Sequence, residues 1–381
     1  MQHIEAKKLF SKYQMGQCTP EEQAIVENWL TFGEVTPFNL TDTELAADLE
    51  DIQMKIPMLK PKKRKLLPLA ATAACLVLCG SLYLYISNKG NDKPSGLMLS
   101  KAQDLAPGGN KATLTLADGR TINLSDAKEG ELVKQAGVNI VKAANGQLIY
   151  NALKTGTAST SYNMVSTPRG GQYQVVLPDG SRAWLNAASS LKFPASFKSM
   201  KTRKVELIGE AYFEIAKDKD HPFIVESKDQ VVEVLGTHFN ISNYAGEETS
   251  KTTLLEGAVR IAAVLNSKNP SSLRLAPSSI LQPGQQAKIS KENIKIANVD
   301  AEADVAWKNG YFKFTDNRIE DIMRQVSRWY DVEVSYEGKA NNDVYSGRIS
   351  RFKNISQVLK MIESAESVHF KVEGRRITVI Q

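Results

Sequence analysis

Two stretches of sequence decide the fold of this chain: PGGNKATLTLADGRTINL at residues 107–124 and PRGGQYQVVLPDGSRAWL at residues 168–185. They align without a gap at an offset of 61 residues, and each places Asp-Gly between two runs of alternating apolar and polar residues. Asp-Gly in that setting is a signal for a tight turn, so each stretch predicts a β-hairpin. We interpret Asp118 and Asp179 as turn formers first and as ligands only second.

Short apolar runs continue on both sides of these hairpins, about ten residues apart. They are LTL at 114–116, QVVL at 174–177, VELI at 205–208, PFIV at 222–225, VVEVL at 231–235, FNI at 239–241 and AVRI at 258–261. Such spacing predicts an antiparallel β structure, either a sandwich, a barrel or a stacked-strand roll. We divide it into a β-rich segment at 105–165, which contains the first hairpin, and an all-β domain at 166–297.

The last part of the chain, residues 298–381, has a mixed pattern. Asn317 and Glu320 have the spacing of a capping box, which opens a helix with apolar residues at positions 319, 322, 323 and 326. A second helix is indicated by apolar residues at 355, 358, 359 and 362, and HFKVE and RRITVI form a closing strand pair. We therefore predict a C-terminal α+β domain built from two βαβ-like units.

A long uncharged run lies near the N-terminus. From Leu66 to Ile86 the chain has no charged residue, and a helix of that length spans about 32 Å against a hydrocarbon core of roughly 30 Å. We predict one transmembrane helix at 66–87, followed by a linker at 88–104. Six Lys or Arg lie within 15 residues of the run on its N-terminal side and three on its C-terminal side, which places the N-terminus in the cytoplasm.

The segment ahead of this run, residues 1–59, has the pattern of a small all-α domain. Apolar residues recur at helical spacing after Ala6 and after a capping box at Thr19, and a third helix begins at Thr41. The segment has four Lys and ten acidic residues, whereas the cluster KPKKRK at 60–65 carries five positive charges. The formal net charge of +6 therefore gives no argument for direct nucleic-acid binding.

Motifs of catalysis are missing from the sequence. It contains no G-x-S-x-G, H-E-x-x-H, Walker A or G-x-G-x-x-G pattern, and its four His have no metal-ligand spacing. We predict a protein that is not an enzyme and that binds neither a metal nor a cofactor.

The run TPRGGQYQVVLPDGSRAWLNAASSLKFP, with VELIGEAYFEIAKDKDHPFIV, VLGTHFNI and LLEGAV after it, resembles the periplasmic domain of FecR-type anti-sigma regulators. GQCTPEEQAIVENWL is similar to the cytoplasmic segment of that family. AWKNGYFKFTDNRIEDIMRQVSRWYDVEV is similar to the C-terminal domain of its longer form, which itself resembles the secretin and TonB N-terminal fold.

The resemblance implies a single-pass inner-membrane protein with its C-terminal domains in a bacterial periplasm. An outer-membrane TonB-dependent transporter would present a periplasmic signalling domain to it, and its cytoplasmic helices would control an extracytoplasmic-function sigma factor. The residues that we expect to face the sigma factor are Leu9, Phe10, Tyr13, Ile25, Trp29 and Leu30. For contact with the transporter we expect Trp329 and Tyr330, which could equally be ordinary core aromatics.

Two alternatives stay open. Gly236-Thr237 matches a position where some family members are thought to cleave themselves, although a turn between two strands explains the same dipeptide. The alternative function is a membrane-anchored periplasmic glycan-binding or glycan-processing β protein, which would show exposed aromatic platforms on the β domain.

Overall fold

Both predicted hairpins are present in the structure. Strand β2 (Thr113–Thr115) pairs antiparallel with β3 (Thr121–Asn123), and β8 (Gly171–Val176) pairs antiparallel with β9 (Arg182–Leu185). The two turns are closed by the same main-chain hydrogen bond. The Leu116 amide donates to the Arg120 oxygen, and the Leu177 amide donates to the Ser181 oxygen, each at 2.8 Å. The repeated sequence therefore encodes a repeated structural unit.

The computed structural model describes residues 104–135, 137–152, 161–265, 274–290, 293–338, 342–364 and 367–381. These residues belong to one compact unit, Asn91–Gln381. The predicted cytoplasmic segment, basic cluster and transmembrane helix, and the linker up to residue 103, lie outside them. Within the described part of the chain, no helix is both long enough and apolar enough to cross a membrane.

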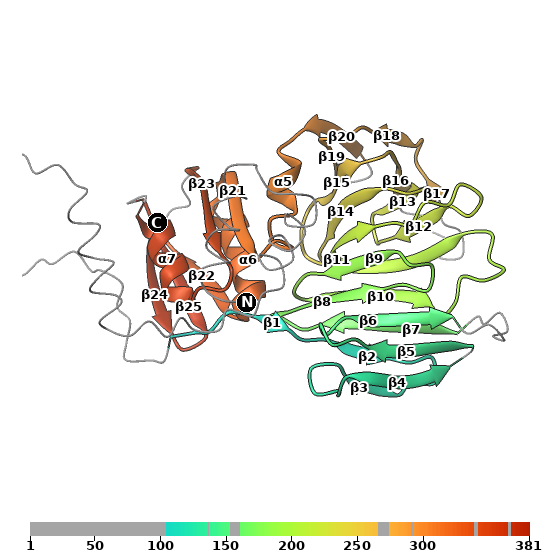
Figure 1. Ribbon diagram of the computed structural model, residues 1–381. Coiled ribbons are helices and arrows are strands. Elements are labelled where there is room, and N and C mark those ends of the chain that lie inside the picture. The colour runs from blue at the N-terminus through green and yellow to red at the C-terminus, as the bar shows by residue number, and fades with distance from the viewer. Residues whose placement is uncertain are drawn as a thin grey trace, which may run out of the picture. The chain divides into compact units, whose positions relative to one another are not determined.

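Residues 109–298 form two β-sheets that share one long strand (Figure 1). The first sheet has the order β3, β2, β7 (Tyr162–Thr167), β10 (Ser189–Pro194), β11 (Arg203–Glu214), β12 (Phe223–Glu226), β13 (Gln230–Val234), β16 (Val259–Leu265) and β18 (Ser279–Leu281). The second has the order β4 (Gly130–Gln135), β5 (Val138–Lys142), β6 (Leu148–Ala152), β8, β9, β11, β14 (His238–Asn243), β15 (Ser250–Glu256), β19 (Gln285–Ser290) and β20 (Asn293–Asn298).

Strand β11 joins the two sheets. Its first half, up to Ile208, pairs in the first sheet, and its second half, from Gly209, pairs in the second. Gly209 has a φ of 88°, a conformation that glycine adopts without steric cost, so it permits the strand to change sheets. Two short strands complete this part: β1 (Gly109–Asn110) beside β8, and β17 (Arg274–Leu275) beside β16.

The inward-facing side chains of both sheets form one hydrophobic core. Four phenylalanines are fully buried in it, and the rings of Phe213 and Phe239 stack with their centroids 5.2 Å apart. Each of the seven apolar runs lies in a strand or at its end. The predicted β architecture is therefore confirmed, as two stacked sheets with a shared core.

The C-terminal module has its own core and contains most of the helical residues that the structure describes. Its elements are β21 (Tyr311–Arg318), α6 (Ile319–Tyr330), β22 (Glu333–Glu337), β23 (Val344–Ser350), α7 (Ile355–Glu363), β24 (His369–Glu373) and β25 (Arg376–Ile380). A short helix, α5 (Ala301–Asp304), lies between the β domain and this module. The predicted order of strands and helices is confirmed.

The pairing inside this module differs from two βαβ units. Strand β21 pairs with β23, whereas β22 pairs in parallel with β25, which also pairs with β24. The strands before and after each helix therefore belong to different sheets. The reason is that β24 and β25 form the predicted closing pair and β25 also pairs with β22. Strand β22 therefore joins the sheet of β24 and β25, whereas β21 and β23 pair with each other.

The predicted capping box at the start of α6 is wrong. Asn317 is still part of β21, where it pairs with Tyr345, and its Oδ1 accepts a hydrogen bond from the Thr315 amide at 2.8 Å. Arg318 is the N-cap residue and makes no side-chain cap bond. Because strand pairing continues to residue 318, the chain passes from strand to helix without a free capping side chain.

Candidate functional site

The two Asp-Gly turns use their aspartates in the same way. Asp118 Oδ1 accepts a hydrogen bond from the Arg120 amide at 3.0 Å, and Asp179 Oδ1 accepts one from the Ser181 amide at 3.1 Å. A side chain that bonds the amide two residues ahead stabilises the turn. Both aspartates therefore act as turn formers.

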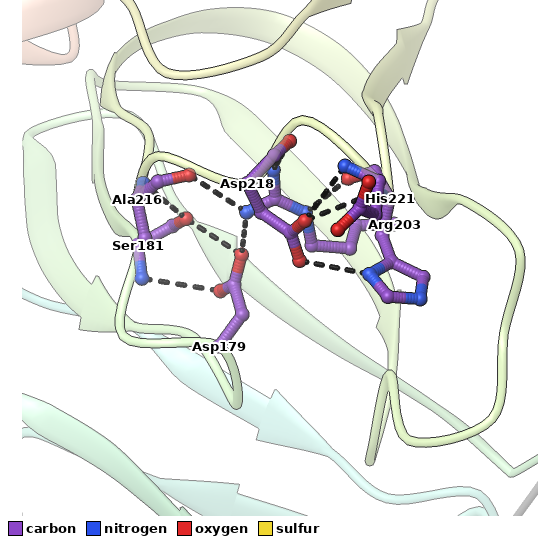
Figure 2. A network of polar contacts seen from close by, with 7 residues as sticks. Asp179, Ser181, Arg203, Ala216, Asp218 and His221 are labelled. Carbon is purple, nitrogen blue, oxygen red and sulfur yellow. Dashed lines mark hydrogen bonds and ion pairs between the residues drawn. The ribbon is translucent and has the colours of Figure 1, made fainter.

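Asp179 also belongs to a buried polar network, shown in Figure 2. The Arg203 guanidinium is only 4% exposed, and its Nη1 lies 2.7 Å from Asp179 Oδ2. Arg203 also donates to the main-chain oxygens of Ala216 and His221, at 2.9 and 2.8 Å. It thus fixes the connection between β11 and β12 to the second hairpin.

This network ties the second turn to the main chain around it. The donors of Arg203 are directed at a carboxylate and at main-chain oxygens. The exposed pair beside it, His221 and Asp218, has its Nδ1 and Oδ2 atoms 2.9 Å apart, and the hydrogen bond from His221 lowers the pKa of Asp218. Within the described ranges, no group of three or more His, Cys, Asp or Glu is placed to hold a metal ion.

Gly236 and Thr237 lie in the connection between β13 and β14. Gly236 has a φ of 150°, and the buried Thr237 donates from Oγ1 to the main-chain oxygen of Ala258 at 3.0 Å. The hydroxyl proton is therefore directed at a carbonyl. This geometry is that of a turn between strands, and self-cleavage at this dipeptide stays a prediction.

Trp329 and Tyr330 are buried at the C-terminal end of α6, with exposed fractions of 1% and 2%. Trp329 Nε1 donates to the main-chain oxygen of Arg351 at 2.8 Å, and Tyr330 Oη donates to that of Lys353 at 2.6 Å. Their burial favours the alternative interpretation as core aromatics.

The six residues expected to face the sigma factor, at positions 9, 10, 13, 25, 29 and 30, lie outside the described residues. Their assignment stays a prediction.

A charged junction joins α6 and the β23–α7 turn to the β domain. Arg328 Nη1 lies 2.6 Å from Glu247 Oε1, and its guanidinium stacks 3.8 Å from the centre of the Tyr244 ring. Arg351 donates to Asn186 Oδ1 at 2.8 Å and to the main-chain oxygen of Trp307 at 2.9 Å. The β domain and the C-terminal module are thus held together by the half-buried Arg328 and the buried Arg351.

Burial also changes the acid-base properties of this junction. It lowers the pKa of Arg351 to about 10, against the opposing attraction of Glu210, so the guanidinium is still charged at neutral pH. Burial raises the pKa of Glu210, while hydrogen bonds from Asn240 and Asn186 oppose that shift. Because each charge is held by specific partners, the junction favours one arrangement of the two parts.

The second hairpin contributes directly to this junction. Arg169, at its start, lies with Nε 2.9 Å from Asp331 Oδ1. Its Nη2 donates to the main-chain oxygens of Ser327 and Val332, both at 2.8 Å, and the Gly170 amide donates to the main-chain oxygen of Arg328. The end of α6 is therefore bonded to the same hairpin that organises the β domain.

Next to Arg169 the C-terminal module carries an open groove of about 1210 Å³. Charged residues of both signs line it, together with Met323, Val334 and Tyr336; the charged ones are Arg169, Glu320, Arg324, Asp331, Glu333, Glu373, Arg375 and Arg376. Glu320 Oε2 is buried and has no hydrogen-bond partner. The groove thus combines charged side chains of both signs with apolar residues.

Strand β22 forms one side of this groove and is the edge of its sheet. The Glu333 amide donates to Arg375 and the Glu337 oxygen accepts from Gln381, so these residues face β25. By the alternation of a parallel ladder, the amides and carbonyls of Val334 and Tyr336 point to the opposite, open side. An edge strand beside a groove is suited to bind an extended polypeptide segment.

Sequence reasoning did not identify this groove. It predicted the strand VEVSY but not that the strand forms an edge. The signal was the charge at both ends of the strand, Glu333 and Glu337, since charged residues are a common feature of edge strands.

Two family models match the chain: "FecR protein" over residues 163–260 and "FecR, C-terminal" over residues 311–379. The chain is also similar to two crystal structures of a candidate anti-sigma factor from Parabacteroides distasonis ATCC 8503, with 28% sequence identity to each. The match to the first structure covers 57% of this chain and 97% of that chain, with a TM-score of 0.50. The match to the second covers 58% of this chain and 99% of that chain, with a TM-score of 0.51. A comparison with curated proteins finds no match.

The two family models fall on the two parts that the structure separates into distinct cores, the β domain and the C-terminal module. Because both matched regions occur in one chain and the structural similarity is to a candidate anti-sigma factor, these findings together support a FecR-type anti-sigma factor.

Proposed function

We propose that this protein is a single-span inner-membrane regulator that receives a periplasmic signal from a TonB-dependent outer-membrane transporter and controls an extracytoplasmic-function sigma factor. The matches to the FecR and FecR C-terminal models, with the similarity to a candidate anti-sigma factor, support the control of a sigma factor. The uncharged run at 66–86 and the basic cluster before it support the placement in the membrane.

The observation that carries the proposal is the combination of the two FecR regions with an open, edge-strand groove on the C-terminal module. A folded signalling domain can present an extended segment to the open side of β22, where main-chain groups at Val334 and Tyr336 are available. The mixed charges around the groove would then select the partner. The C-terminal module is in this way the receiver of the signal.

Binding to the sigma factor is the first test. Residues 1–59 are co-purified with the sigma factor encoded beside the chain, and Trp29→Ala is compared with the wild-type segment. We expect the wild-type segment to retain the sigma factor and Trp29→Ala to weaken retention, because aromatic residues dominate interface energies. No retention by the wild-type segment would contradict sigma control, whereas retention unaffected by Trp29→Ala would remove only Trp29 as an anchor.

Binding at the groove is the second test. Val334→Pro removes an amide that points to the open side of β22 and leaves the ladder to β25 intact. We expect it to abolish retention of the transporter's signalling domain by the full chain. The control, Tyr336→Phe, keeps the strand backbone and should bind as the wild type does. Equal binding by Val334→Pro and the wild type would show that strand addition is not used.

The alternative function as a glycan-binding protein finds less support. In the β domain, Tyr162 is the one aromatic side chain that is exposed among the described residues, and Lys192 lies over its ring at 5.2 Å. An isolated, covered tyrosine is not an aromatic platform.

A further inference from the structure

Helix α7 lacks the N-terminal features that normally stabilise a helix. Its N-cap residue, Asn354, makes no side-chain cap hydrogen bond, and its first turn contains no acidic residue. The first amides of a helix have no partner inside it, and a negative charge near them is favourable. Helix α7 therefore depends on groups from elsewhere in the chain.

Those groups come from the last residue of the predicted linker, Asp104, and from the residue after it, Leu105. The Ile355 amide donates to the main-chain oxygen of Leu105 at 3.1 Å, and the Ser356 amide donates to Asp104 Oδ1 at 3.2 Å. Ser356 Oγ donates to Asp104 Oδ2 at 2.6 Å. A carboxylate 252 residues away in sequence thus caps α7 and supplies the negative charge that its own first turn lacks.

The next residues of the chain continue along the same junction. Leu105 packs against the core of the C-terminal module. A Cβ on Gly108 would lie 2.8 Å from the Trp329 ring and 2.8 Å from the Gly170 oxygen, so this position accepts only glycine without displacement of its neighbours. The Gly109 amide then donates to the Gly170 oxygen at 3.0 Å, and β1 pairs in parallel with β8.

We propose that residues 104–110 form a strap that couples the C-terminal module to the chain before residue 104. The strap begins on α7, passes Trp329 and ends as a strand beside the second hairpin. A displacement of α7 is therefore transmitted to Asp104 by their hydrogen bonds, and not through the core of the β domain. The direction of the signal rests on the proposed function, whereas the strap itself rests on the contacts.

Hydrogen exchange measured by mass spectrometry on the full chain tests the strap. Asp104→Ala removes both hydrogen bonds of the cap, and we expect exchange of the amides at 104–110 and 355–356 to rise about tenfold or more. Ser356→Ala removes only the hydroxyl bond and keeps the amide bond to Asp104, so it should raise the same exchange by a smaller factor. The double variant should exchange no faster than Asp104→Ala alone, since that variant already removes both bonds. Ser356→Thr keeps the hydroxyl and should restore slow exchange.

Asp118→Ala is the matched control, because Asp118 also bonds an amide near it but lies in an exposed turn. It should leave exchange at 104–110 unchanged. If Asp104→Ala and Ser356→Ala leave that exchange at the wild-type rate, or if Asp118→Ala raises it equally, the strap is overturned.

Sigma-dependent transcription in cells tests the coupling. We expect Asp104→Ala and Ser356→Ala to alter the response to the transport signal and Asp118→Ala to preserve it. Faster exchange with an unchanged response would overturn the coupling and leave the sigma-regulating function intact. Failure of the proposed function would instead appear as loss of sigma binding by the wild-type segment, which is independent of the exchange measurement.

Discussion

The first hairpin, residues 107–124, and the second, residues 168–185, are equivalent in sequence and turn geometry but differ in what surrounds them. Asp118 of the first turn pairs with Arg120, and both side chains are about half exposed or more. Asp179 of the second turn pairs with the buried Arg203, which comes from a different strand. The first turn is self-contained, and the second is tied to the rest of the domain.

The difference between the two hairpins shows where stability is added to a repeated unit. The local signals, Asp-Gly and alternating apolar residues, are shared, so they give both hairpins the same turn. Arg203, 24 residues beyond Asp179, adds a buried ion pair to one turn only. Arg169 likewise connects only the second hairpin to the C-terminal module.

Loss of Arg203 is expected to give the largest difference in stability between a variant of the second hairpin and its counterpart in the first. Breaking a buried pair by removal of one partner costs about 3 to 5 kcal/mol, so Arg203→Met should lower the free energy of unfolding by that amount. Arg120→Met should leave it nearly unchanged, because Arg120 is 67% exposed. Urea unfolding followed by tryptophan fluorescence measures both. Equal losses of unfolding free energy in the two variants would contradict the difference between the hairpins.

Loss of the aspartate is expected to have the next largest effect. Asp179→Ala breaks the same pair but leaves Arg203 bonded to the main-chain oxygens of His221 and Ala216, so it should cost less, about 1.5 to 3 kcal/mol. Asp118→Ala should cost less, since solvent replaces its contacts. The double variant of Asp179→Ala with Arg203→Met should cost less than the two single losses added together. Additive losses in the same unfolding measurement would show that these residues act independently.

The turn glycines should behave alike. Gly119 and Gly180 have φ of 85° and 83°, and a Cβ at either position would meet nothing within 4 Å. Gly119→Ala and Gly180→Ala should therefore each cost about 1 to 2 kcal/mol, the penalty of that conformation for a residue with a side chain. A clear difference between their unfolding midpoints would mean that the two backbones are not equivalent.

The smallest effect concerns pH. The hydrogen bond from the Arg120 amide, with the one from its side chain, lowers the pKa of Asp118. A lowered pKa means that the carboxylate stabilises the folded state above its unfolded pKa, and this contribution is lost as the pH falls through the folded pKa. A carboxyl NMR titration of Asp118 should have its midpoint below 3.8, the usual value, and Arg120→Met should move it upward.

Sequence reasoning predicted much of the β domain because its signals are local. The hairpins, the seven apolar runs and helix α7 were found from residue spacing alone. A third turn of the same kind was missed: the Gly146 amide donates to the Ala143 oxygen at 2.8 Å, between β5 and β6. Asn145-Gly146 was the signal for it, since Asn-Gly favours such turns as Asp-Gly does.

The candidate site was much less predictable. Trp329 and Tyr330 were expected at a contact surface because they end an amphipathic helix, but helical spacing does not tell which of two surfaces a residue faces. The groove, the buried Arg351 and the cap on α7 depend on residues far apart in sequence, such as Asp104 and Ser356. No single-sequence pattern places such residues together.

By itself the sequence determined the turns, the alternation of the strands and the resemblance to the FecR family, because these depend on neighbouring residues and on runs of residue types. Only the tertiary structure decided that Asp179 is buried with Arg203, that β22 has an open edge and that Asp104 caps a helix near the end of the chain. The physical reason is that burial and pairing between distant residues depend on the packing of the whole unit, which local sequence does not encode.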